Sequence, residues 1–189
     1  MQPIRDRKQI EAIKKILKSS NMRDYCIFTL GINGGGLRIH ELLRLTLGHV
    51  LDEQGNLRDR VVIRDKETGK AKEFWLNEAA VKAIKEFLSK RSWNALDEPL
   101  FPSRKKSGGN LVALNRDQAY KVINSAARAA GIQEKVGTET LRKTWGYHAY
   151  LAGFPLKAIQ RIFNHSSEKK TRDYLGIKEE EPARINLNL

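Results

Sequence analysis

Apolar residues recur at intervals of three and four along most of this chain, and this spacing constrains its fold more than any other feature. Such a period places apolar side chains on one face of an α-helix. It predicts helices over residues 6–18, over residues 23–32, from about Leu37 through Leu42, Leu43 and Leu45, after Asn77, from Asn115 through Ala126 with Gly131 beyond its end, and over the stretches ETLRKTWGYHAYLAG, PLKAIQRIF and KKTRDYL.

The middle of the chain changes from helical to alternating spacing. Residues 58–77, with the sequence RDRVVIRDKETGKAKEFWLN, predict two strands around a turn at Glu67, Thr68 and Gly69. Residues 97–110, DEPLFPSRKKSGGN, combine prolines and glycines with no clear period, so they predict a loop. The expected fold class is therefore mostly α with a small antiparallel β-sheet (α+β), in one domain.

The charge of the chain narrows its partners. Thirty-five Lys and Arg against 22 Asp and Glu give a formal net charge of +13. Such a surface favours polyanions such as nucleic acid, although a merely soluble basic protein remains the alternative. No apolar run reaches the roughly 18 residues of a membrane span, and the charged start does not resemble a signal peptide, so we expect a cytoplasmic protein. The single cysteine, Cys26, excludes an internal disulfide and a cysteine-rich metal site.

A first group of candidate functional residues lies in GGGLRIHELLRL. Arg38 follows three glycines at the expected start of a helix, a place well suited to receive a phosphate. Glu41 lies three residues further on the same helix face, where it can pair with the Arg38 guanidinium and orient it. An ordinary surface ion pair is the alternative for these two residues.

Two further groups lie near the C-terminus. Arg142, in TLRKTWGYHAY, is placed beside an apolar helix stripe, where a buried guanidinium needs either a carboxylate or a ligand anion. His165 ends one predicted helix in NHSSEKKTRDYLG, and Tyr174 lies on the next, nine residues later. A structural salt bridge for Arg142 and an ordinary packing role for Tyr174 are the alternatives when each group is considered alone.

Considered together, these groups resemble the tyrosine recombinase, or phage integrase, family. The resemblance rests on GLRIHELLRL, the strand–turn–strand, TLRKT and NHSSEKKTRDY, and it extends from about Arg23 to Gly176. It implies the catalytic-domain fold of that family. It also implies that Tyr174 attacks a DNA phosphodiester and forms a 3′-phosphotyrosyl link, that Arg38 and Arg142 hold the phosphate, and that His165 donates a hydrogen bond to it. No metal and no other cofactor is implied.

Two positions depart from the family pattern. Glu139, in TETLRKT, stands three residues before the second arginine, where the family usually has histidine. Glu67 stands in the turn where the family places a lysine that protonates the leaving 5′-oxygen. Lys66 is the first candidate for that lysine and Lys70 the second, and either could equally be a solvated surface residue. Both departures place a carboxylate near a phosphate, so activity could be reduced.

The resemblance also carries expectations about organisation and partners. We expect residues 1–189 to form a single catalytic domain with a C-terminal tail at 177–189 and without the N-terminal clamp domain that the family commonly carries. The expected partner is double-stranded DNA with attachment sites, on which we expect the protein to form a homo-oligomer, a tetrameric synapse, from monomers. The alternatives are a catalytically weak or inactive DNA-binding regulator on the same scaffold, and strand cleavage of the type IB topoisomerase kind.

Overall fold

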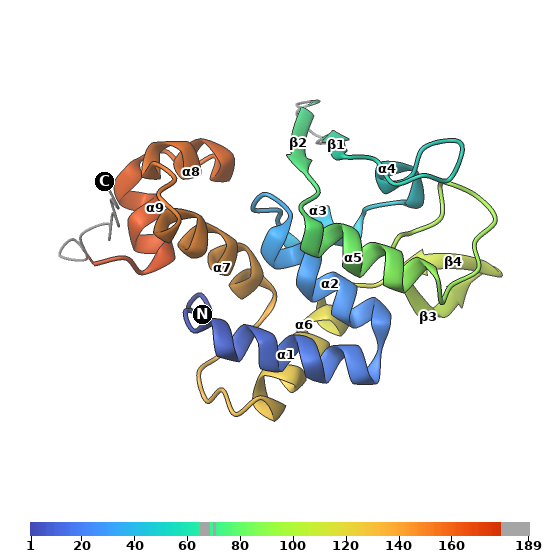
Figure 1. The fold of residues 1–189 in the computed structure, drawn as a ribbon, viewed down its shortest axis with the longest axis horizontal. Coiled ribbons are helices and arrows are strands. Elements are labelled where there is room, and N and C mark those ends of the chain that lie inside the picture. Colours follow the sequence, from blue (N-terminus) through green and yellow to red (C-terminus); the bar gives the residue numbers. More distant parts are fainter. Residues whose placement is uncertain (65–68, 70, 179–189) are drawn as a thin grey trace.

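A buried helix lies at the centre of the fold. The computed structural model describes residues 1–64, 69 and 71–178. Helix α1 (Arg7–Ser20) is capped by the Asp6 side chain, and Asn21 caps the following helix α2 (Met22–Asn33). Because α2 is apolar on most of its faces, it can contact α1, α5 and α7 at once. Figure 1 shows α2 between α1 and α5.

The predicted strand–turn–strand is confirmed on both sides of the turn. Strand β1 (Arg60–Arg64) pairs antiparallel with β2 (Ala71–Trp75), with Arg60 opposite Trp75 and Arg64 opposite Ala71. Two short helices, α3 (Ile39–Leu43) and α4 (Leu47–Val50), precede this hairpin. Helix α5 (Glu78–Leu88) follows it, with the Asn77 side chain as the predicted N-cap. The helix predicted from about Leu37 begins two residues later, and Leu45 is buried beyond its end.

The predicted loop at residues 97–110 is wrong in part, because it contains most of a second hairpin. Strand β3 (Pro102–Ser107) pairs antiparallel with β4 (Asn110–Ala113). Gly108 and Gly109 connect the strands at φ +55° and +81°, the backbone of a two-residue hairpin turn. The Gly-Gly pair was therefore a hairpin signal. The expectation of a single small sheet is corrected, because the described residues form two two-stranded sheets.

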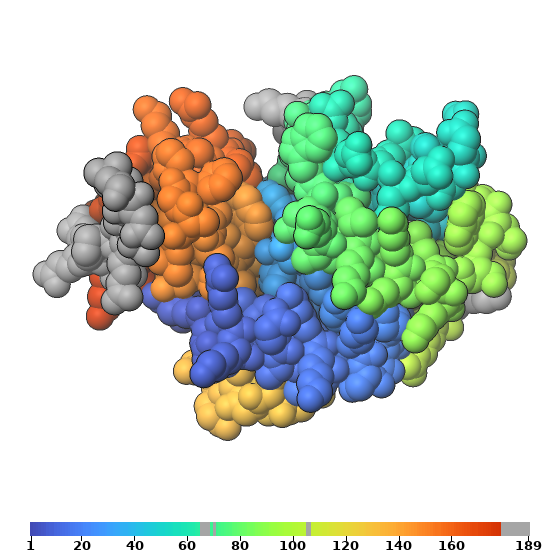
Figure 2. Space-filling view, in the orientation of Figure 1, coloured from blue at the N-terminus to red at the C-terminus, as the bar shows by residue number. Residues whose placement is uncertain are grey.

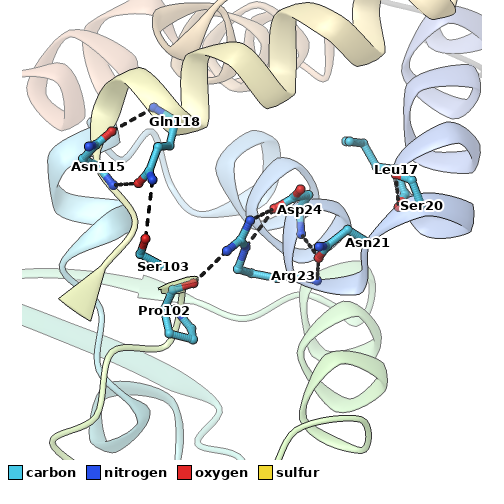
Figure 3. A network of polar contacts seen from close by, with 9 residues as sticks. All are labelled: Leu17, Ser20, Asn21, Arg23, Asp24, Pro102, Ser103, Asn115 and Gln118. Atoms are coloured by element: carbon cyan, nitrogen blue, oxygen red, sulfur yellow. Dashed lines mark hydrogen bonds and ion pairs between the residues drawn. The ribbon is translucent and has the colours of Figure 1, made fainter. Parts of the chain in front are cut away.

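Polar contacts fix this second hairpin between two helices (Figure 3). The Arg23 guanidinium pairs with Asp24 and donates a hydrogen bond to the Pro102 carbonyl at 2.7 Å. Gln118, on the first turn of the helix that follows this hairpin, donates a hydrogen bond to the Ser103 hydroxyl at 3.4 Å. These side chains satisfy polar groups that a free loop would leave to water, so they stabilise strand β3 against the helical core.

After β4, the described part of the chain is helical, as predicted. It comprises α6 (Arg116–Ala129), α7 (Thr138–Leu151), α8 (Leu156–Phe163) and α9 (Glu168–Leu175). The main hydrophobic core joins α1 to α6 and the start of α7, whereas a smaller cluster joins the rest of α7 to α8 and α9. Figure 1 shows this smaller unit beside the main body. In the described ranges, no helix is long and apolar enough to cross a membrane.

Candidate active site

The surface is hollowed between the two hydrophobic clusters, and three of the predicted site residues line this hollow. Figure 2 shows it as a notch between the β2 side and the α7–α8 side. The residues that line it include Arg38 and Glu41 from one cluster and Arg142 and Asn164 from the other, with Lys72 on β2. Residues from four elements far apart in sequence therefore converge on one place.

Arg38 immediately precedes α3 and is exposed. The turn before it includes Gly35 and Gly36 at φ +62° and +72°. A Cβ on Gly36 would lie 2.6 Å from the Phe163 ring and 3.0 Å from the Trp145 ring. Glycine is therefore required here both by its backbone angle and by the close approach of the second cluster. This turn holds Arg38 at the edge of the hollow.

Glu41 does not pair with the Arg38 guanidinium, which corrects the expectation from sequence. Its Oε2 atom accepts a hydrogen bond from the Arg38 backbone N–H at 2.6 Å. The same atom forms an ion pair with Lys72 Nζ at 3.0 Å. Burial alone would raise the pKa of the Glu41 carboxyl, but these two contacts outweigh burial and leave the pKa below its usual value. Within the described part of the chain, no carboxylate lies at ion-pair distance from the Arg38 guanidinium.

Lys72 is a site residue that the sequence interpretation missed. Its ammonium also donates to the Gly36 carbonyl at 3.3 Å. Burial lowers the pKa of Lys72, the ion pair with Glu41 opposes this, and the charges of Arg142 and Arg38 lower it further. The alternation of residues along β2 could have indicated this, because it places Lys72 on the same face of the strand as buried Phe74.

Arg142 is buried, with 6% of its surface exposed, and lies on α7. Its Nη2 donates to the Phe163 carbonyl at 2.9 Å, and its guanidinium lies 4.3 Å from the centre of the Phe163 ring. Burial lowers the pKa of Arg142, the nearby Tyr174 opposes this, and Arg38 lowers it further. A buried guanidinium whose contacts are a carbonyl and a ring retains donors for an anion.

His165 lies just beyond α8, where Asn164 ends the helix in the left-handed conformation (φ +54°). Its Nδ1 lies 3.0 Å from the hydroxyl of Thr171, which donates its own hydrogen to the Ser167 carbonyl. The hydroxyl oxygen therefore receives Nδ1–H, and Nε2 is left for the site. Burial and then the charges of Arg142, Lys170 and Arg38 lower the pKa of His165.

Tyr174, on α9, packs edge-to-face against two rings. The centroid distances are 5.0 Å to His165 and 5.6 Å to Phe163. Burial raises the pKa of the Tyr174 phenol, Glu139 raises it further, and Arg142 and Arg38 oppose this. The phenol is therefore neutral near pH 7 and needs activation before it can act as a nucleophile.

One pocket brings together four of the predicted site residues and the unusual glutamate. Arg38, Glu139, Arg142, His165 and Tyr174 all line it. Two guanidiniums and an imidazole can hold an anion such as a phosphate, with a phenol beside it. This arrangement suits nucleophilic attack on a phosphate group.

The structure describes Glu139 but not the lysines of the predicted turn. Glu139 is exposed on the first turn of α7 and faces the same pocket as Tyr174. Lys143, one helical turn further on, lies 4.4 Å from the centre of the Tyr174 ring. Lys66, Glu67 and Lys70 lie outside the described residues, as does most of the predicted tail, so their positions stay a prediction.

The amino-acid sequence is similar to known recombinases. The phage integrase family pattern matches residues 5–181. A probable integrase/recombinase, YoeC of Bacillus subtilis (strain 168), is 37% identical over 180 residues, which cover 95% of this chain and 92% of that protein. The tyrosine recombinase XerC of Pelobacter propionicus is 28% identical over 82% of this chain, which spans about half (48%) of that relative.

Solved structures share the fold. The XerA recombinase matches with a TM-score of 0.76 at 24% identity, over 94% of this chain and 60% of that one. The catalytic domain of bacteriophage HP1 integrase matches with a TM-score of 0.62 at 17% identity, over 96% and 91%. The XerH site-specific recombinase, solved bound to its difH substrate after cleavage, matches with a TM-score of 0.69 at 19% identity, over 94% and 50%. The predicted fold class is therefore confirmed.

Proposed function

Because this chain belongs to the phage integrase family of tyrosine recombinases, we propose that it cleaves and rejoins DNA strands through a covalent 3′-phosphotyrosyl intermediate. The observation that carries this proposal is the shared pocket of Tyr174 with Arg38, Arg142 and His165. A phenol beside three phosphate-binding groups suits this reaction better than simple DNA binding, which needs no nucleophile.

In the proposed cleavage step, the Tyr174 Oη atom attacks the scissile phosphorus. The bond from phosphorus to the 5′-oxygen breaks, so the 3′ end stays on the tyrosine and a 5′-hydroxyl leaves. The phenol loses its proton and the leaving oxygen gains one. Arg38 and Arg142 stabilise the extra negative charge on the phosphate oxygens. Attack by the 5′-hydroxyl of a second strand reverses the step, so rejoining needs no external energy source.

His165 can contribute once a phosphate is present. In the free protein its lowered pKa favours the neutral ring. A phosphate in the pocket would raise that pKa through its negative charge, and the imidazolium would then donate Nε2–H to a phosphate oxygen while Nδ1–H stays on Thr171. For the proton of the leaving 5′-oxygen we propose Lys66 as donor and Lys70 as the second candidate.

The remaining proposals concern partners and organisation. The high positive charge of the chain supports double-stranded DNA as the substrate. We propose a homo-oligomer on DNA, tetrameric in the synapse, that assembles from monomers. We also propose a single catalytic domain with a C-terminal tail, and the cytoplasm as the place of action because the enzyme must reach DNA.

Glu139 favours a second candidate function, a DNA-binding regulator with little or no activity. Its carboxylate lines the pocket and raises the pKa of the Tyr174 phenol, and it cannot donate a hydrogen bond to a phosphate while ionised. Such a protein would bind DNA through the same surface without forming a covalent adduct. The experiment below separates the two functions.

The test uses a nicked duplex that carries the attachment site, so that cleavage releases a short strand and traps the covalent adduct. Wild-type protein should form a denaturation-resistant adduct and Tyr174→Phe none. Tyr150→Phe is the matched control, because Tyr150 also packs partly buried against the smaller cluster. Equal adduct from Tyr174→Phe would refute the nucleophile, and binding without any adduct from wild type would favour the regulator.

A further inference from the structure

The carboxylate of Glu41 lies among three cationic side chains but pairs with only one of them. It forms an ion pair with Lys72, and the charge of Arg142 also lowers the pKa of the carboxyl. Arg38, one residue before α3, carries the third cationic group. The side chains of Lys72 and Glu41 are only 23% and 16% exposed, so their attraction is screened less than on an open surface.

Without Lys72, the nearest remaining partners for this carboxylate would be the two guanidiniums. Residues three apart at the start of a helix can reach each other, so a released Glu41 could turn to Arg38. Arg142 already interacts with Glu41 electrostatically. A carboxylate and a phosphate compete for the same bidentate donors, so such a pair would occupy the groups that the substrate needs.

We propose that Lys72 is a positioning residue that holds the Glu41 carboxylate away from the Arg38 and Arg142 guanidiniums, so that both stay available to the phosphate. Lys72 suits this role because it also donates to the Gly36 carbonyl, on the turn that leads into Arg38. Glu41 in turn accepts the Arg38 N–H. Strand β2, through Lys72, thus determines where the carboxylate of Glu41 lies relative to Arg38. The inference rests on the proposed function for its role in cleavage, but the ion pair can be tested without DNA.

The test removes Lys72 and then removes its partner. Lys72→Met keeps the length of the side chain without its charge, and it should reduce single-turnover cleavage of the nicked duplex by about 10- to 100-fold. Glu41→Gln keeps an oxygen for the Arg38 N–H but is a poor competitor for guanidiniums. The double variant Lys72→Met/Glu41→Gln should therefore recover most of the lost rate, and Lys72→Arg should retain most of it.

Arg60→Met is the matched control. Arg60 lies on the same hairpin, and Arg60→Met also removes one positive charge. Its partner Glu73, however, has an exposed side chain, whereas the side chain of Glu41 is mostly buried. It should change cleavage little. If Lys72→Met does not fold, Lys72→Gln replaces it, because its amide can still donate to the Gly36 carbonyl.

A second measurement separates this inference from the proposed function. Inorganic phosphate should raise the melting temperature of wild type and of the double variant, but raise that of Lys72→Met much less. This result would support the inference even if wild-type protein formed no DNA adduct. An unchanged cleavage rate and phosphate response in Lys72→Met would overturn it. A double variant as impaired as Lys72→Met would also overturn it, because Lys72 would then act directly or only as a structural link.

Discussion

The rings of His165 and Tyr174 lie edge-to-face, with centroids 5.0 Å apart and an angle of 72° between their planes. Burial shifts their pKa values in opposite directions, down for the imidazole and up for the phenol. Both groups are therefore neutral near pH 7. The positive charge of the pocket then comes from its arginines and Lys170, and an entering phosphate would raise the pKa of His165.

The first prediction follows from that shift. In an NMR titration, His165 should have a pKa below 6.5, the reference value, and inorganic phosphate should raise it. Because the folded-state pKa is depressed, the unfolded state binds more protons between the two pKa values, and stability should fall as the pH drops through this window. His165→Asn should weaken that dependence. It should not abolish it, because burial also lowers the pKa of His49. A pKa that phosphate leaves unchanged would contradict the role of His165.

The second prediction concerns the hydroxyl that orients His165. Thr171→Val keeps the shape of the side chain but removes the acceptor of Nδ1–H, so cleavage should fall about tenfold and stability by about 1 kcal/mol. Thr144→Val is the control, because Thr144 is equally buried and also donates to a carbonyl one turn back. It should lose similar stability and little cleavage. Equal cleavage in the two variants would show that Thr171 is only structural.

The third prediction tests the geometry of Arg142. A lysine keeps the charge but cannot donate to the Phe163 carbonyl and grip a phosphate with two further N–H groups at once. Arg142→Lys should therefore reduce single-turnover cleavage by about 10²–10³-fold with a much smaller change in DNA binding. Arg161→Lys makes the same exchange at an exposed position of the neighbouring hollow and should cost little. Similar losses in both variants would argue against Arg142 as a phosphate ligand.

The fourth prediction concerns Glu139, whose carboxylate raises the pKa of the Tyr174 phenol. Removing that charge should favour phenolate and remove repulsion of the phosphate, so Glu139→Gln should speed cleavage and Glu139→His should speed it further. Glu168→Gln, in the first turn of α9, is the control for the loss of one negative charge. Slower cleavage by Glu139→Gln would instead identify Glu139 as a proton acceptor. Adding Glu67→Lys should increase the rate again if that turn position holds the proton donor.

The fifth prediction concerns the contact between the two hydrophobic clusters at Gly36. Gly36→Ala combines a positive φ of +72° with a Cβ only 2.6 Å from the Phe163 ring. We expect a loss of about 2–5 kcal/mol in unfolding free energy, from backbone strain and overpacking together. Gly131→Ala isolates the strain, because its φ is +81° but its Cβ would meet nothing within 4 Å. Chemical denaturation of both variants measures the difference, and equal losses would refute the packing contribution.

The sequence by itself determined the helices, the first hairpin and the positions of Arg38, Arg142, His165 and Tyr174 along the chain. These features follow from local signals: apolar periods, the caps Asn77 and Asn115, and motifs with fixed spacing. Only the tertiary structure decided which partner each charge finds. Glu41 pairs with Lys72, 31 residues away, and not with the nearer Arg38 guanidinium, because the packing of β2 places the ammonium beside it. The place of the second hairpin has the same explanation: its Gly-Gly turn is a local signal, but Arg23 and Gln118 hold β3 from distant helices. Spacing along a chain fixes local faces, whereas ion pairs depend on distances in space that only the packed core sets.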